Sequence, residues 1–136
     1  MVSFLPFNEN VAEMSISEYK VDVAITGINK MEGDIRIAIY SSNEEFLSEK
    51  DIMDFRIVPV DGSTVNCQFK VNEKGQYAMA LVHDLNRNGK MDVNFFGWPK
   101  EPYAFSKNPG IWFRAPTFEE CAIQVDGDER IEIKMK

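Results

Sequence analysis

Apolar and polar residues alternate along several short stretches of this chain, and a period of two residues is typical of half-buried β-strands. The clearest stretch is 34–40, in which isoleucines occupy every second position. Similar patterns predict further strands at 19–27, 52–60, 64–71, 118–125 and 130–135, and the apolar stretch 76–82 is a further predicted strand. Turn residues such as Asp61-Gly62 separate these stretches, so we expect antiparallel neighbours joined mostly by short connections.

The stretch 76–82 differs from the others because it is apolar on both faces, with Tyr77 and Met79 on one side and small alanines on the other. A strand of this kind is expected inside a sheet rather than at its edge. Helical periodicity is almost absent, apart from one or two turns expected at 43–50. We therefore predict an all-β protein, an antiparallel β-sandwich of about seven strands of the immunoglobulin-like or prealbumin-like kind.

Length and composition fit one packed domain. The chain has 136 residues, of which 44% are hydrophobic and 12% aromatic, and this is enough to bury a sizeable core. We assign residues 18–136 to a single β-sandwich domain and residues 1–17 to a flexible leader. The segment Met1 to Phe7 is apolar but too short for a complete signal peptide, so it is either the remainder of one or a disordered leader.

The charge and the cysteines narrow the class of protein. A net charge of −7 argues against a nucleic-acid partner, because phosphate binding needs a basic face. No apolar run approaches the roughly 18 residues of a transmembrane helix. Cys67 and Cys121 lack the CxxC spacing of a zinc site or a redox dithiol, and whether they pair with each other stays open.

The segment that follows the stretch 76–82 carries oxygen-bearing side chains at every second position. This spacing matches the first part of an EF-hand calcium loop, whose ligands alternate because the chain must wrap around the ion. Gly89 stands where such a loop requires a sharp turn. The predicted calcium ligands are Asp84, Asn86, Asn88, the backbone carbonyl of Lys90, and Asp92.

Phe95 occupies the position at which an EF-hand loop places its last ligand, a bidentate glutamate. That ligand must therefore come from elsewhere in the chain or from water, and Glu101 is the nearest carboxylate downstream. Asn88-Gly89 is also a strong hairpin signal by itself, so a plain β-turn is the alternative interpretation. We favour the metal loop because a hairpin has no use for Asp84 and Asp92 at ligand spacing.

The residues offer little for catalysis. The single histidine, His83, stands at a strand end, where a structural role is more common than general-base catalysis. The sequence contains no Gly-x-Ser-x-Gly elbow, phosphate-binding glycine loop or dinucleotide fingerprint. We therefore predict that the protein is not an enzyme, and a metal-assisted hydrolase at the calcium loop is a further alternative.

Aromatic side chains are concentrated in the long stretch 93–117, which contains both tryptophans. Loops of this length without regular structure are usually functional. Exposed rings would stack on sugars or contact an apolar partner, so Trp98, Tyr103 and Trp112 are candidate ligand-binding residues of a carbohydrate- or peptide-binding module. The alternative is that the loop folds onto the sheet edge and forms a small satellite core.

Four segments carry a family resemblance: Tyr77–Ala80, His83–Asp92, Asn94–Ser106 and Ala115–Glu120. They are similar to a bacterial family called domain of unknown function 2141, and the likeness extends from Tyr19 to the end of the chain. The sequence departs from the family's pattern at Leu85, where a polar residue is usual, and at Ala104, where a glycine is expected.

The resemblance implies a small exported β-sandwich protein, periplasmic or secreted, with no assigned activity. The Asp-x-Asn-x-Asn-Gly-x-x-Asp segment is also similar to calcium loops in the sandwich repeats of bacterial surface adhesins, which supports the metal interpretation. We therefore expect a non-catalytic, calcium-stabilised module of the bacterial cell envelope. Its cofactor would be a structural Ca²⁺, and its partner a carbohydrate or a protein of the cell surface.

Overall fold

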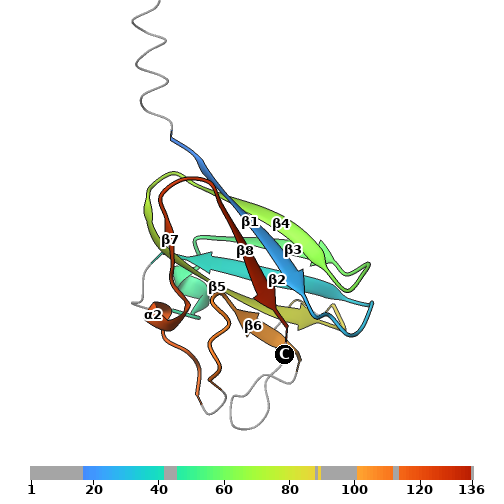
Figure 1. The fold of residues 1–136 in the computed structure, drawn as a ribbon. Coiled ribbons are helices and arrows are strands. Elements are labelled where there is room, and N and C mark those ends of the chain that lie inside the picture. Colours follow the sequence, from blue (N-terminus) through green and yellow to red (C-terminus); the bar gives the residue numbers. More distant parts are fainter. Residues whose placement is uncertain (1–16, 42–45, 88, 90–100, 112–113, 136) are drawn as a thin grey trace, which may run out of the picture.

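The structure is a computed structural model, and it describes residues 17–41, 46–87, 89, 101–111 and 114–135. Within these residues, eight strands form two sheets that pack face to face (Figure 1). The smaller sheet contains, in spatial order, β4 (Val65–Val71), β1 (Tyr19–Thr26) and β8 (Glu129–Lys134). The larger sheet contains, in spatial order, β3 (Asp54–Pro59), β2 (Asp34–Tyr40), β5 (Gly75–Asp84) and β6 (Tyr103–Phe105), and β7 (Ile123–Val125) also pairs with β5.

The core lies between the sheets and follows from the alternation along the strands. One face of each sheet supplies large apolar side chains to this space, and Val23, Ile37 and Phe69 are at most 1% exposed. The register keeps these faces aligned, since Ile37 on β2 lies opposite Leu81 on β5. The predicted β-sandwich is therefore confirmed. One pairing differs from an antiparallel arrangement, because β1 and β8 run parallel to each other.

Two expectations for the C-terminal third are wrong. The predicted strand at 118–125 begins as a helix, α2 (Phe118–Cys121), and only its end is a strand, β7. The helix forms because Thr117 and Glu120 cap it reciprocally, each side chain accepting a hydrogen bond from the backbone N–H of the other. The stretch 93–117, expected as a loop without regular structure, contains strand β6.

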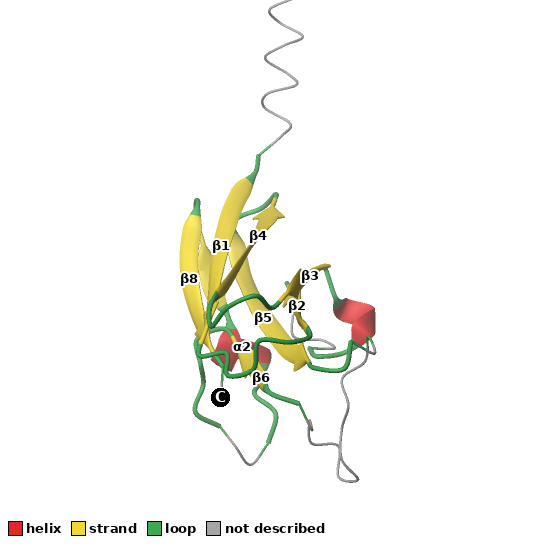
Figure 2. Ribbon diagram, turned by 90° about the vertical axis from the view of Figure 1, so that its right-hand side faces the viewer, coloured by secondary structure: helices red, strands yellow, loops and turns green. Residues whose placement is uncertain are grey.

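A second, smaller apolar cluster lies on the outer face of the larger sheet. Tyr40 on β2 and Ala78 on β5 lie opposite each other, and both belong to a cluster with Phe118 and the partly buried Phe46. The ring of Phe46 meets those of Tyr40 and Phe118 edge to face, with centroids 5.0 and 5.8 Å apart. The short helix η1 (Glu49–Asp51) lies on the same side, away from the smaller sheet (Figure 2). The two clusters explain why β5 is apolar on both faces.

The remaining sequence-based expectations concern the helical turns at 43–50, the N-terminal leader, membrane-spanning helices and the two cysteines. Of the helical turns predicted at 43–50, the described residues form η1 and a turn before it, and residues 42–45 lie outside the described part of the chain. The leader also lies outside it, up to residue 16. Among the described helices, none is long and apolar enough to cross a membrane. Both cysteines are free: Cys67 lies on β4 and Cys121 in α2.

Candidate metal centre

Buried polar side chains are few in the described part of the chain, and three of the four lie at the end of β5. His83, Asp84 and Glu101 are 2%, 1% and 8% exposed. His83 and Asp84 are the last residues of β5, whereas Glu101 comes from the segment just before β6. Because β6 pairs with β5, the chain returns to this end of the sheet and places Glu101 beside Leu85, 16 positions earlier.

Asp84 lies where β5 ends and the predicted calcium loop begins. Its backbone lies opposite Asp34 on β2, and its Oδ2 accepts a hydrogen bond from the N–H of Gly89 at 2.9 Å. Gly89 has φ of +76°, a left-handed conformation that favours glycine. The chain after β5 therefore folds back toward the first predicted ligand.

The two carboxylate oxygens of Glu101 lie in different environments. Oε2 accepts a hydrogen bond from the N–H of Leu85 at 2.8 Å. The next residue, Pro102, accepts one from the N–H of His83, also at 2.8 Å. Oε1 is buried and has no hydrogen-bond partner among the described residues. Burying a charged oxygen without a donor or a cation is costly, so this atom marks a place where a cation would stabilise the fold.

The loop between β1 and β2 holds the end of β5 from the other side. Nε2 of His83 lies 2.6 Å from the carbonyl oxygen of Glu32, and this nitrogen carries the proton because a carbonyl only accepts. Gly33 packs so closely that a Cβ there would lie 2.4 Å from the carbonyl oxygen of Asp84. Arg87, in the turn after β5, donates a hydrogen bond to the carbonyl of Gly33 at 3.3 Å. The end of β5 is thus fixed by two separate segments.

The structure places two of the predicted ligands, Asp84 and Glu101, at the same end of β5, where Glu101 accepts a hydrogen bond from the residue after Asp84. Asn86 is exposed on the turn after β5. The other predicted ligands lie outside the described residues: Asn88, Lys90 and Asp92. Within the described ranges, no group of three or more His, Cys, Asp or Glu side chains is arranged to hold a metal ion. The two buried carboxylates fit calcium in chemical type, because this ion prefers hard oxygen donors.

Of the three candidate ligand-binding aromatics, the structure describes Tyr103. Trp98 and Trp112 lie outside the described residues. The half-buried ring of Tyr103 meets that of Phe105 edge to face, with centroids 5.7 Å apart. Both side chains line an open groove on the outer face of the larger sheet.

The described thiols and the buried serine are not activated as nucleophiles. Burial raises the pKa of the Cys67 thiol to about 11 and that of Cys121 to about 12. Ser106 is wholly buried, and its Oγ donates to the carbonyl of Cys121 at 2.6 Å and accepts from the N–H of Met79 at 2.9 Å. These bonds join β5, β6 and α2, so we assign Ser106 a structural role.

Cys67 is expected to react with a disulfide reagent at pH 8 about 100-fold more slowly in the native protein than in the unfolded chain. Its pKa rises from 9.0 to about 11, so the fraction of reactive thiolate falls by about two orders of magnitude. The absorbance change with Ellman's reagent, measured on a Cys121→Ser variant, reports on Cys67 alone. Equal rates in the native and the unfolded chain would contradict this explanation.

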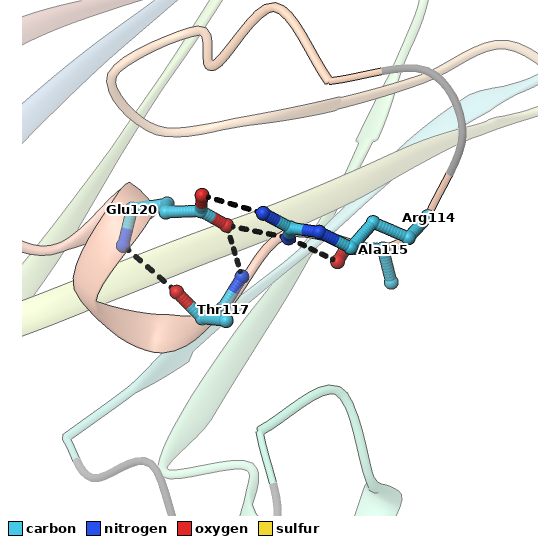
Figure 3. Close-up of polar contacts among 4 residues, drawn as sticks. All are labelled: Arg114, Ala115, Thr117 and Glu120. Atoms are coloured by element: carbon cyan, nitrogen blue, oxygen red, sulfur yellow. Dashed lines mark hydrogen bonds and ion pairs between the residues drawn. The ribbon is translucent and has the colours of Figure 1, made fainter.

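Arg114 reinforces the capping box of α2 (Figure 3). Its Nη1 and Nη2 donate to Oε1 and Oε2 of Glu120 at 2.8 and 2.9 Å. These bonds hold the pKa of Glu120 at about 2, below its ordinary value of 4.5. The carboxylate therefore contributes to stability above about pH 4.5, and the contribution is lost as the pH falls toward 2, although solvent screens this exposed pair. The charge of Arg114 is thus balanced locally.

A comparison with models of known protein families identifies the family of this chain. A family model described as an uncharacterized protein conserved in bacteria matches residues 23–133, most of the chain. The chain belongs to the DUF2141 family. No curated protein and no solved structure matches it significantly. Membership of DUF2141 confirms the resemblance seen in the sequence, whereas the calcium loop and export stay predictions.

The structural positions of two residues are not apparent from the sequence of this DUF2141 protein: Gly33, which packs on the end of β5, and Arg36, which lines the open groove on the outer face of the larger sheet. Gly33 resembles an ordinary turn glycine, and only the structure shows its close approach to the backbone of Asp84. Arg36 resembles a solvent-facing residue of an alternating strand. The sequence signal that could have revealed the position of Arg36 is the apolar character of both faces of β5. It indicates that side chains also pack on the outer face of the larger sheet.

Proposed function

We propose that this DUF2141 protein is a non-catalytic β-sandwich module of the bacterial cell envelope, stabilised by a calcium ion at the end of β5. The observation that carries the proposal is the buried Oε1 of Glu101, which has no hydrogen-bond partner among the described residues. An ion there would balance this charge. It would also join the segment before β6 to the loop that begins at Asp84.

Glu101 supplies what the predicted loop lacks. An EF-hand loop ends on a glutamate, and this chain has Phe95 at that position. The pairing of β6 with β5 brings Glu101 to the loop from outside it, where its carboxylate takes the role of the missing ligand. Asp84 is then the first ligand, and the remaining ones are those predicted from the sequence: Asn86, Asn88, the Lys90 carbonyl and Asp92.

The proposal of a non-catalytic role rests on how the reactive groups are engaged. Nε2 of His83 donates its proton to the carbonyl of Glu32, and His83 is almost completely buried. The raised pKa values keep both thiols protonated at neutral pH. A metal-assisted hydrolase needs an open coordination position that faces a cleft, whereas Asp84 and Glu101 are both buried.

The envelope location is supported by the family resemblance and by the ligand count. Asp84, Asp92 and Glu101 are the only carboxylates in the proposed ligand set, and a set with few charges favours dissociation constants of about 10⁻⁵ to 10⁻³ M. The weaker part of this range suits extracellular modules better than cytosolic buffers. Fractionation of cells that make the natural full-length protein tests the location, and recovery in the cytoplasm would overturn it.

Calcium is expected to raise the melting temperature by about 8–11 °C over a chelated sample when its concentration is a hundredfold the dissociation constant. An ion that binds only the folded state then stabilises it by about 2.7 kcal/mol. For a domain of this size, each kcal/mol corresponds to about 3–4 °C. Thermal unfolding followed by circular dichroism, with calcium and with chelator, measures the difference.

Two variants make this test specific. Asp84→Ala should abolish the calcium response because it removes the first ligand and its charge. Glu73→Gln is the matched control, because Glu73 is an exposed carboxylate in the turn at the opposite end of β5, and it should keep the full response. A melting temperature that ignores both calcium and chelator would refute the metal site, and the loop would then be the plain hairpin.

A further inference from the structure

The larger sheet places a row of four side chains across its outer face. Phe55 on β3 lies opposite Ala38 on β2, Ala38 lies opposite Ala80 on β5, and Ala80 lies opposite Phe105 on β6. Two aromatic rings therefore flank two alanines, and the small side chains leave a hollow between the rings. The groove has a volume of about 1170 Å³, similar to the upper range of pockets that bind small organic ligands.

The groove is closed at one end and open along one side. The outer apolar cluster around Tyr40 and Phe46 closes the end toward the start of β5. The side formed by β3 is open to solvent, since Phe55 and Ile57 are 52% and 47% exposed. Large apolar side chains that stay exposed beside a hollow are typical of an interaction site.

Arg36 lies next to this hollow, and the other charged residues that line the groove are Glu49, Asp54 and Arg114. Arg36 lies one row further along the sheet, opposite Ile57 on β3 and Val82 on β5, and Val82 in turn lies opposite Tyr103 on β6. Arg36 as a whole is partly buried, and its guanidinium has no hydrogen bond or ion pair in the part of the chain that the structure describes. A cation of this kind, set among apolar neighbours, favours an anionic group from a ligand.

Of the two arginines that line the groove, Arg36 is the one left to bind an anionic group of a ligand. Arg114 also lines the groove, but Glu120 holds it in a bidentate pair. Asp54, at the β3 side, is paired with Arg56, with Nη1 and Oδ2 2.9 Å apart. The planar guanidinium of an arginine matches the two oxygens of a carboxylate better than a point charge does.

We propose that this groove binds a small apolar molecule that carries one carboxylate. The apolar part lies over Ala38 and Ala80 between the two phenylalanine rings, and the carboxylate pairs with Arg36. A sugar would fit less well, because it needs several hydrogen-bonding groups, and the two rows offer only the guanidinium of Arg36 and the hydroxyl of Tyr103. Gly89 of the proposed calcium loop lines the groove, but none of the described calcium ligands does, so the pairing with Arg36 does not depend on the ion.

Decanoate, used below its critical micelle concentration, is the probe. Calorimetric titration into the full chain should show saturable binding of one decanoate per protein. Arg36→Gln should weaken this binding about 10- to 100-fold, because it removes the charge-assisted hydrogen bonds to the carboxylate. Decanol has the same chain and no charge, so the wild-type protein should bind it no more tightly than Arg36→Gln binds decanoate.

A second variant tests the hollow itself, and a third is the matched control. Ala38→Leu should fill the space between the rings and weaken decanoate binding by about tenfold or more. Arg130→Gln removes an exposed arginine from β8 on the other sheet, and it should bind like the wild type. Arg36→Gln should keep the wild-type melting temperature, since Arg36 has no partner in the described structure to lose.

Three outcomes would overturn the proposal. The first is the absence of saturable decanoate binding, and the second is binding that Arg36→Gln leaves unchanged. The third is a dimeric wild-type protein that Phe55→Ser makes monomeric in light-scattering measurements, because a second copy of the chain would then cover this face.

Discussion

Gly33→Ala is expected to lower the melting temperature by about 6–20 °C. Gly33 has φ of +74°, and an alanine adopts this conformation at a cost of about 1–2 kcal/mol. The added Cβ would lie 2.4 Å from the carbonyl oxygen of Asp84 and 2.7 Å from Cα of Leu85, and such overpacking costs about 1–3 kcal/mol more. Each kcal/mol corresponds to about 3–4 °C here, and thermal unfolding followed by circular dichroism measures the loss.

Gly89→Ala separates the conformational cost from the clash. Gly89 has nearly the same φ, +76°, but a Cβ there would have no described heavy atom within 4 Å. It should therefore lose only the conformational part, about 1–2 kcal/mol or 3–8 °C. If both variants lose the same amount, the β1–β2 loop does not pack on the end of β5 as tightly as the structure indicates.

The strands could be predicted from the sequence because their signal is local. The isoleucines of β2 alternate within seven residues, and the structure has a strand with the predicted bounds, Asp34–Tyr40. The apolar residues on both faces of β5 likewise predicted an interior strand, and β5 pairs with β2, β6 and β7. In both cases the information lies within one element and needs no knowledge of its partner.

Pairing partners and very short elements were not predictable in this way. The parallel pairing of β1 with β8 joins the two ends of the domain, and no pattern inside either strand fixes their relative direction. The helix α2 has four residues, which is too short for helical periodicity to appear. Its available signal was the spacing of Thr117 and Glu120, a Ser/Thr-x-x-Glu capping box.

The same distinction between local and long-range information applies to the residues of the candidate metal site and of the groove. Asp84 could be named from its spacing to the other oxygen-bearing residues, because a metal loop is a local motif. Glu101 could be named only as the nearest carboxylate downstream, since its position depends on the pairing of β6 with β5. Arg36 has no local signal for its role, because residues from four strands form the groove beside it.

Glu101→Gln is expected to remove the calcium response and, in chelator, to raise the melting temperature above that of the chelated wild type. The amide keeps an oxygen that accepts the hydrogen bond from the N–H of Leu85. It also removes the charge of a buried carboxylate whose Oε1 has no partner among the described residues. The NH2 group takes the place of Oε1, and a neutral group costs less to bury than a charged one even without a partner. We expect this difference to be about 1–3 kcal/mol, or about 3–12 °C, and thermal unfolding with and without calcium measures both effects.

Glu101→Ala separates the effect of removing the charge from the effect of losing the hydrogen-bond acceptor. It removes the same charge but also leaves the N–H of Leu85 without its acceptor, so in chelator it should be less stable than Glu101→Gln by about 1–3 kcal/mol. Neither variant should respond to calcium. If the chelated wild type is more stable than chelated Glu101→Gln, the charge of Glu101 is already balanced within the protein. The ion would then have no role at this carboxylate, and the ligand that replaces the twelfth position of the loop would have to be sought elsewhere.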